Sequence, residues 1–316
     1  MKEGAAGGHV SGAGPGDPRN GVIASIATPF AADGSLDRAS LRKYVGYCIA
    51  CGVTGILTPA FAGEVNELTE PERLAVVETV LDEAAGRVPV IGCATALTQD
   101  RRLQGARSLL AAGCDAILVH VAHEPAVDMR GNVMAVADLQ PKLLMVQDAD
   151  NQGPGLPVEL IARLHAEVPS FRWIKVEVVN RCRKFPQIRE AAGPGLRIGT
   201  AGLQMIEALD RGVDAYMPTI MLDVYDEVFR LHGVGRRAEA VALFERLLPI
   251  IMFPYSHAPL PFNKRLLVRL GLFASEAVRR AGETLDAVED RLADELVERA
   301  VQLTRSRGRV AVPRSD

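Results

Sequence analysis

The chain has 316 residues, of which 48% are hydrophobic and 24% charged, and its formal net charge is −3. This composition is ordinary for a globular protein, and the length suits an α/β barrel built as one unit. The weak negative charge gives no electrostatic basis for binding nucleic acid, and no apolar run is long enough to cross a membrane. Composition therefore predicts a cytoplasmic protein that binds neither nucleic acid nor membranes.

The start of the chain differs from the rest. Residues 1–20 are rich in Gly, Ala and Pro and lack the apolar core of a signal peptide. Such a segment has too few apolar side chains to fold by itself. We therefore expect residues 1–20 to be a disordered lead.

The five cysteines give no sign of a disulfide framework or a metal site. Their number is odd, they lie in apolar surroundings, and the Cys48–Cys51 pair has no second pair or histidine cluster beside it. We expect buried thiols and no bound metal.

Beyond residue 20, short apolar runs alternate with longer amphipathic ones. Eight runs are typical of strands: 21–30, 55–59, 88–94, 116–122, 143–148, 171–177, 196–200 and 214–219. Helical patterns lie between them, near 38–50, 71–85, 99–111, 131–140, 157–167, 181–192 and 202–210. This regular alternation indicates parallel βα units.

The number of units favours one fold over another. A doubly wound open sheet also alternates, but eight strands favour a (β/α)8 TIM barrel. No GxGxxG motif follows the first strand and no GxxxxGK[ST] motif occurs, which weakens nucleotide-binding alternatives. We predict a barrel over residues 21–225 and a C-terminal helical extension, packed on it, over residues 226–316.

Lys175 stands out in the sixth predicted strand, FRWIKVE. Alternate residues of a strand share a face, so Trp173, Lys175 and Glu177 are predicted to point the same way. Near the carboxyl end of a barrel strand, that face lies at the usual place of an active site. A desolvated lysine there is a candidate amine nucleophile, and a structural ion pair with Glu177 is the alternative.

A series of motifs in order along residues 20–275 resembles a known family, the dihydrodipicolinate synthase/N-acetylneuraminate lyase group of class I aldolases and lyases. The matching stretches are ATPF (27–30), DGSLD (33–37), GVTGIL (52–57), Gly63 to Arg73, GRVPVIG (86–92), AGCDAIL (112–118), IK (174–175) and FNKRLLVRLGL (262–272). The resemblance implies that Lys175 forms a Schiff base with a 2-keto acid such as pyruvate. It also implies a homo-oligomer, a dimer or tetramer.

Around this lysine the sequence departs from the family pattern. The two hydroxyl residues that usually precede Gly63-Glu64 are Phe61 and Ala62 here. The tyrosine at the end of strand five, the family's proton relay, aligns best with Val146, so the usual relay is missing. The chain is therefore identified as a divergent member, and not as a true dihydrodipicolinate synthase.

Other groups can replace the missing relay. Glu177 shares a face with Lys175, and Asp148 is predicted to face inward two residues after Val146. His120 and His123 follow strand four, where a histidine can act as acid or base. The predicted catalytic residues are Lys175, Glu177 and Asp148, and the predicted substrate-binding residues are Ala62, Gly63, Glu64, His120, Gln147 and Gly199.

The function predicted from these residues is a Schiff-base lyase or aldolase. Its substrate is a small 2-keto acid, pyruvate-like or a 3-deoxy-2-keto sugar acid, and imine chemistry needs no cofactor. One alternative is a dehydratase or deaminase on the same scaffold. Another is a non-catalytic relative that only binds a keto acid.

Overall fold

The computed structural model describes residues 16–96, 98–120 and 128–305. Eight parallel strands form a closed barrel in which each strand pairs with its neighbours in sequence. Gly21 of the first strand pairs with Ala215 of the last, which closes the barrel. The strands are β1 (Gly21–Ser25), β2 (Gly55–Thr58), β3 (Val90–Cys93), β4 (Ala116–His120), β5 (Leu144–Asp150), β6 (Phe171–Val178), β7 (Arg197–Thr200) and β8 (Ala215–Tyr216). The TIM barrel prediction is confirmed, and the open sheet is excluded.

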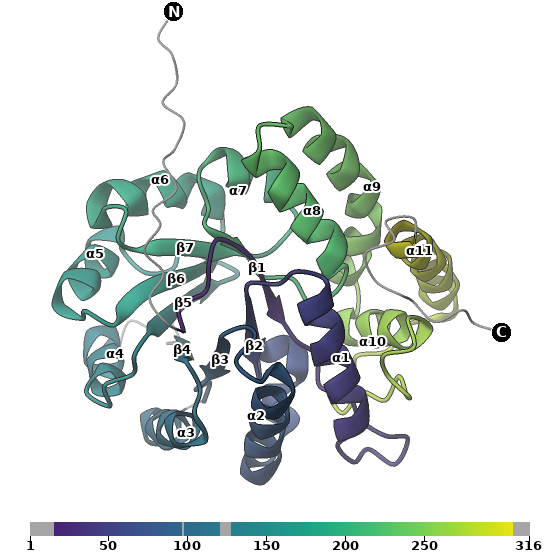
Figure 1. Cartoon of the computed structure of the whole chain (residues 1–316), viewed down its shortest axis with the longest axis horizontal. Coiled ribbons are helices and arrows are strands. Elements are labelled where there is room, and N and C mark those ends of the chain that lie inside the picture. Colours follow the sequence, from purple (N-terminus) through teal and green to yellow (C-terminus); the bar gives the residue numbers. More distant parts are fainter. Residues whose placement is uncertain (1–15, 97, 121–127, 306–316) are drawn as a thin grey trace, which may run out of the picture.

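Eight helices surround the barrel (Figure 1). They are α1 (Arg38–Ala50), α2 (Glu70–Ala84), α3 (Gln99–Ala112), α4 (Met129–Ala137), α5 (Val158–Glu167), α6 (Arg181–Ala192), α7 (Met205–Asp210) and α8 (Leu222–Gly233). Local sequence explains several starts, because the side chains of Asp37, Thr69, Thr98 and Asp128 accept hydrogen bonds from amides in the first turn. Two short 3₁₀ turns, η1 (Phe61–Gly63) and η2 (Val65–Glu67), join β2 to α2.

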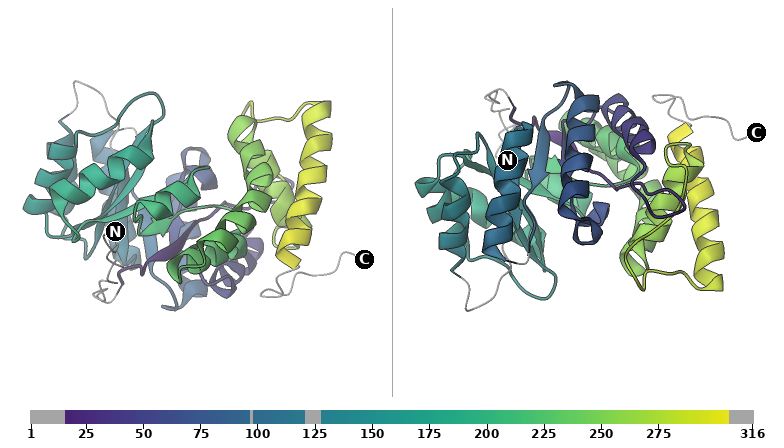
Figure 2. Two further views of the ribbon diagram at one scale, coloured as in Figure 1. Left: turned by 90° about the horizontal axis from the view of Figure 1, so that it is seen from above. Right: turned by 90° about the horizontal axis from the view of Figure 1, so that it is seen from below.

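The C-terminal extension consists of α9 (Arg237–Ser256), α10 (Pro259–Arg269) and α11 (Ala287–Arg305). These helices stand together at one end of the molecule in both views of Figure 2. The predicted boundary at residue 225 is corrected, because it falls inside α8. That helix packs against β1 and buries Leu222, Val224 and Val228 completely, so it completes the barrel and the extension begins after it.

The end of the predicted lead is part of the fold. Asp17 is buried, and its carboxylate accepts a hydrogen bond of 2.7 Å from the indole nitrogen of Trp173. Arg197 donates to Asp17 and to the carbonyl of Pro18. The residues just before β1 therefore cap the amino-terminal end of the barrel, whereas residues 1–15 lie outside the described part of the chain.

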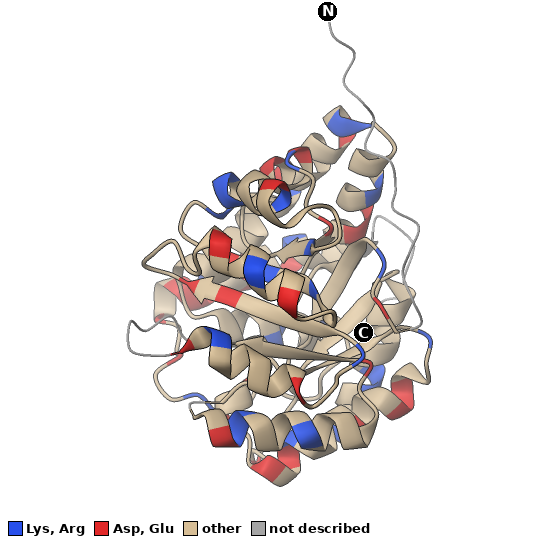
Figure 3. Ribbon diagram, turned by 90° about the vertical axis from the view of Figure 1, so that its left-hand side faces the viewer, with Lys and Arg blue, Asp and Glu red and all other residues tan. Residues whose placement is uncertain are grey.

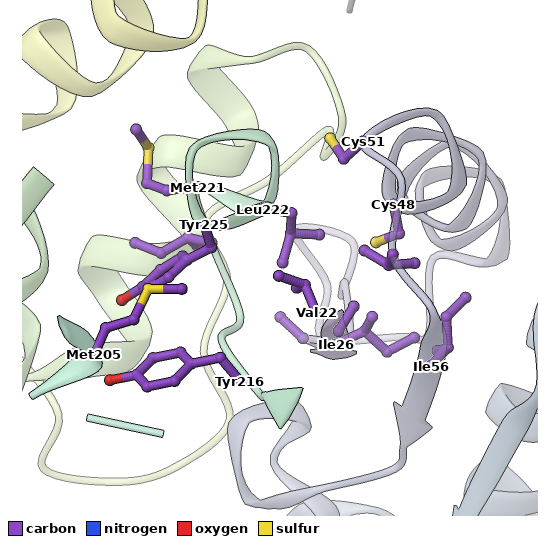
Figure 4. Packing of buried hydrophobic residues seen from close by; sticks show 14 of the residues in the cluster. Val22, Ile26, Cys48, Cys51, Ile56, Met205, Tyr216, Met221, Leu222 and Tyr225 are labelled. Atoms are coloured by element: carbon purple, nitrogen blue, oxygen red, sulfur yellow. The ribbon is translucent and has the colours of Figure 1, made fainter. Parts of the chain in front are cut away.

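Apolar side chains form two cores. The inner one fills the barrel and includes Ile23, Leu57, Met145 and Trp173. The outer one lies between strands and helices, and Figure 4 shows its side chains from β1, β2, α1, α7, β8 and α8. All five cysteines are buried free thiols, as predicted.

Charge is distributed without a dominant sign. On the side of the molecule drawn in Figure 3, basic and acidic segments are interspersed along the helices. None of the helices in residues 16–305 that the structure describes combines the length and the apolar character of a membrane span.

Arg279 ties the extension to the barrel. Its guanidinium donates to both carboxylate oxygens of Glu72 and to the carbonyl of Gly34, and it stacks over the ring of Phe30 at 4.1 Å. The hydrogen bonds from Arg279 lower the pKa of Glu72 to about 2. Because the folded-state pKa is depressed, this stabilisation is complete above the ordinary pKa of 4.5 and is lost as pH falls toward 2.

We expect Glu72→Gln to destabilise the protein by about 1 kcal/mol at pH 7, because both partners of the lost ion pair are partly exposed. Glutamine preserves the capping contact with Thr69, so only the charge is removed. Urea unfolding between pH 7 and pH 3 should show the difference from wild type shrinking below pH 4.5. Glu239→Gln, in an exposed pair with Arg236, is the control, and a pH-independent effect of Glu72→Gln would contradict the assignment.

Candidate active site

A cavity of about 760 Å³ opens at the carboxyl ends of the strands. Its floor comes from the barrel, and its roof from the last turn of α9, the start of α10 and Arg280 of the loop that follows. The floor is lined by Ser25, Leu57, Cys93, Thr95, His120, Gln147, Ala149, Lys175, Glu177 and Met217, and the roof by Ile251, Pro254, Tyr255, His257, Pro259, Leu260, Asn263 and Arg280.

Strand register assembles the floor. His120 pairs with Gln147, Gln147 with Lys175, and Lys175 with Gly199, so these four residues form one layer across β4 to β7. Trp173 points into the inner core, and Lys175 and Glu177 line the cavity above it. The predicted shared face of Trp173, Lys175 and Glu177 is confirmed.

Lys175 and Glu177 are in direct contact. Lys175 is only 6% exposed, and its Nζ lies 2.9 Å from Oε2 of Glu177. The same oxygen accepts a hydrogen bond of 2.7 Å from Nε2 of Gln147. The ion pair considered as the structural alternative is therefore present, and it lies inside the cavity.

The electrostatics of the floor favour an ionised Glu177. Burial pulls its pKa upward, but the charge of Lys175 and hydrogen bonds from Lys175 and Gln147 prevail, so the pKa lies below its ordinary value. Tyr255 is 55% exposed because it faces the open cavity. Even so, the surrounding protein and the negative charge of Glu177 raise the pKa of its hydroxyl to about 12. At neutral pH the site thus holds a carboxylate and an un-ionised phenol.

His120 lies where it was predicted. Its ring lines the cavity and meets Phe61 edge to face, with centroids 5.6 Å apart. Burial lowers the pKa of His120, and the charges of Arg102 and Lys175 add to this effect. His120 is therefore a neutral imidazole near physiological pH. His123, the other candidate on this loop, lies outside the described residues.

The expectation for Asp148 is corrected. In β5 the residue beside Lys175 is Gln147, and Val146 belongs to the outer core. Because side chains alternate, Asp148 also faces outward. Its carboxylate accepts hydrogen bonds from the Leu156 amide at 2.8 Å and from Nζ of Lys184 at 2.7 Å. Asp148 therefore stabilises the loop after β5 and does not line the cavity.

The turn after β2 combines cavity and anchor residues. Ala62 lines the cavity, whereas Gly63 packs against the segment after β1, and its carbonyl accepts from the Thr28 hydroxyl at 2.7 Å. The prediction that Gly63 and Glu64 bind substrate is therefore corrected, because neither residue of this pair lines the cavity and Glu64 is fully buried. Its carboxylate binds the ammonium of Lys264 and the amides of residues 279 and 280. Glu64 therefore holds this turn against the extension.

Gly199 also differs from the prediction. It is not a lining residue, because the side chain of Met217 lies over it. A Cβ at this position would lie 2.3 Å from the Met217 methyl group. Glycine thus makes room for Met217, which lines the cavity in its place.

The roof residues were missed by sequence reasoning. Tyr255, His257, Asn263 and Arg280 belong to helices and loops that sequence patterns could not place over the barrel. The available signal was the segment 253–264, FPYSHAPLPFNK, which interrupts two apolar helical runs with prolines and polar residues. Arg181, at the start of α6, also lines the cavity and donates to the Ala201 carbonyl at 2.6 Å.

A metal centre is not formed by the described residues, among which no three His, Cys, Asp or Glu side chains gather as ligands. The polar groups that line the cavity include a paired lysine and carboxylate, two arginines, amides, hydroxyls, phenols and imidazoles. This set suits proton transfer and amine chemistry.

Known proteins resemble this chain in sequence and in fold. The model of the Dihydrodipicolinate synthetase family matches residues 18–298. The chain is 27% identical over 275 residues to the L-2-keto-3-deoxyarabonate dehydratase of Azospirillum brasilense, covering 83% of this chain and 88% of the relative. It is 28% identical over 264 residues to the 4-hydroxy-tetrahydrodipicolinate synthase of Nitrosococcus oceani, covering 81% and 89%. The crystal structure of a putative dihydrodipicolinate synthetase from Pseudomonas aeruginosa superposes with a TM-score of 0.81 at 25% identity, covering 89% and 99%.

We expect Asp148→Asn to reduce stability without reducing turnover per folded molecule. The substitution leaves the buried ammonium of Lys184 without its charged partner, which typically costs about 3 kcal/mol. Urea unfolding and the specific activity of the folded fraction measure the two effects separately.

The double variant Asp148→Leu/Lys184→Met serves as the control, because it removes both charges and should recover much of the loss. A large drop in the turnover number of folded Asp148→Asn would contradict a purely structural role.

Proposed function

The chain belongs to the dihydrodipicolinate synthetase family of class I aldolases and lyases, and we propose that it cleaves or dehydrates a small 2-keto acid bound to Lys175 as a Schiff base. Family membership makes it an enzyme, which removes the non-catalytic alternative. The observation that carries the proposal is the buried Lys175–Glu177 pair on the floor of the cavity.

The first chemical step uses this pair directly. The Lys175 ammonium passes a proton to Glu177, and the resulting amine attacks the C2 carbonyl of the substrate. The attacking nitrogen gives one of its two protons to the carbonyl oxygen, and Glu177 returns the proton that it holds to the same oxygen, which leaves as water. The product of this step is a protonated imine between Nζ and C2, with the Glu177 carboxylate restored.

The second step depends on the bond that breaks. For dehydration, Glu177 removes a C3 proton to give an enamine, which then expels the C4 hydroxyl as water with the proton returned by Glu177. For aldol cleavage, a base takes the C4 hydroxyl proton and the C3–C4 bond breaks, which releases an aldehyde and leaves an enamine. The base then returns the proton to C3, which gives the imine. In both cases water hydrolyses the final imine and frees Lys175.

Two observations favour dehydration. Gln147 stands beside Lys175 on β5, and an amide cannot relay a proton as the family's strand-five tyrosine does. Proton transfer therefore falls to Glu177, which elimination can use for both removal and return. The similarity to a protein named as a keto-deoxyarabonate dehydratase supports a 3-deoxy-2-keto sugar acid as substrate.

Backbone amides at the start of η1 are candidates to bind the carboxylate of the substrate. This turn begins at Phe61, and the first amides of a helix have no acceptor within it. We propose that the amides of Phe61 and Ala62 bind C1, while Glu64 holds the turn in place. A homo-oligomer, dimer or tetramer, is part of the proposal on family grounds alone.

We expect borohydride reduction with pyruvate to add one reduced pyruvate to the protein, on Lys175. Intact mass and peptide mapping measure the adduct. Lys184 and Lys264 are matched controls, since both are buried and ion-paired but lie outside the cavity. Labelling of either of these, or of no lysine with any 2-keto acid, would refute the proposed intermediate.

We expect Glu177→Gln to lower turnover about 10²- to 10⁴-fold, because the amide cannot carry a proton. Borohydride should still trap the adduct on Lys175, but more slowly, since water then carries the protons of imine formation. The assay follows a five-carbon 3-deoxy-2-keto acid by mass spectrometry, where loss of water indicates dehydration and release of pyruvate indicates aldol cleavage. Glu239→Gln is again the control. Wild-type turnover in Glu177→Gln would exclude Glu177 as the proton carrier.

A further inference from the structure

The roof of the cavity holds a polar side chain with unused hydrogen-bonding capacity. Asn263 is 9% exposed and lines the cavity, and its Oδ1 has no hydrogen-bond partner in the described part of the chain. No hydrogen bond joins its amide nitrogen to another described residue either. Buried amides are normally satisfied, so an unpaired one beside a cavity points to a ligand.

The helix fixes this amide in place. On either side of Asn263 along α10, Phe262 and Lys264 are fully buried, and Lys264 is bound to Glu64 and to the carbonyl of Ala277. The helix therefore cannot turn Asn263 out to solvent. A half-turn of the carboxamide itself presents either its oxygen or its nitrogen to the cavity.

A second polar group lines the same roof. Tyr255 lies in the last turn of α9 and lines the cavity, and its un-ionised hydroxyl can donate and accept. Tyr255 and Glu177 line the same cavity, Tyr255 from the roof and Glu177 from the floor. The cations at the cavity are already engaged, Arg280 with Glu283 and Phe61, and Arg181 with Ala201.

We propose that Asn263 and Tyr255 form a distal subsite that binds the hydroxyl groups on the tail of the substrate. The inference rests on the proposed function, in which Lys175 holds the keto end. An amide and a phenol match hydroxyls, which also donate and accept, whereas an apolar tail would leave the buried amide unpaired. The subsite thus makes the C-terminal extension the part that selects hydroxylated acids over plain ones.

The experiment compares two acids of equal chain length. One is a 3-deoxy-2-keto pentonate, with hydroxyls on C4 and C5, and the other is 2-ketopentanoate, which has none. Titration calorimetry gives both dissociation constants in the Glu177→Gln background, where turnover is slowed about 10²- to 10⁴-fold. We expect about tenfold tighter binding of the hydroxylated acid, and a ratio near one after Asn263→Leu.

Pyruvate is the internal control, because it is too short to carry a hydroxylated tail. Its affinity should be the same with and without Asn263→Leu. Tyr255→Phe should also reduce the ratio of the two dissociation constants. If Asn263→Leu does not fold, the ratio in Tyr255→Phe is the test of the subsite. Tyr47→Phe, a buried tyrosine away from the cavity, should leave the ratio unchanged.

The subsite is overturned if the variants that fold keep the wild-type ratio, or if they weaken pyruvate as much as the hydroxylated acid. Failure of the proposed function has a different signature. In that case neither acid gives a borohydride-stable adduct on Lys175, whatever the calorimetric ratio.

Discussion

Closure of eight strands into a barrel gives every strand an inner and an outer face, and the site depends on which side chains fall on the inner one. Gln147 and Asp148 are adjacent in β5, yet Gln147 contacts Glu177 in the cavity while Asp148 binds Lys184 outside it. The face of the strand on which a residue lies therefore decides its role more than its chemical type does. Lys175 is reactive in our proposal because it lies on the inner face of β6 and near the carboxyl end of that strand, which places it at the cavity floor.

Three buried lysines show that burial alone does not make a lysine catalytic. Lys175, Lys184 and Lys264 each contact a carboxylate within hydrogen-bonding distance. The partners of Lys184 and Lys264 are almost entirely buried, and these pairs join loops or helices. Glu177 retains 23% exposure of its side chain, so the pair that it forms with Lys175 can be reached by a small molecule. Access to one partner separates a reactive pair from two structural ones.

Much of the fold could be predicted from sequence because hydrophobic periodicity is a local property. The eight strands and seven helices were found close to their observed bounds, and the face shared by Lys175 and Glu177 followed from alternation within one strand. Asp148 was misplaced because the alignment set Val146, and not Gln147, opposite the lysine. Glu64 was wrongly assigned to substrate binding, since its role depends on a contact with Lys264, 200 residues away. Asn263 and Tyr255 were not assigned, because their helices come from a part of the chain far from the strands. Loop geometry and long-range packing leave no local pattern to detect.

The contacts of Glu64 and Arg279 join the C-terminal extension to the barrel, so the two parts depend on each other. Glu64 binds Lys264 of α10, and Arg279 of the following loop binds Glu72 of α2, so the roof is fastened to the barrel at two points. A truncation after the eighth barrel helix would remove no strand and no floor residue, but it would leave the carboxylate of Glu64 buried or exposed without its ammonium. The barrel and its extension therefore have to be gained, exchanged or lost together.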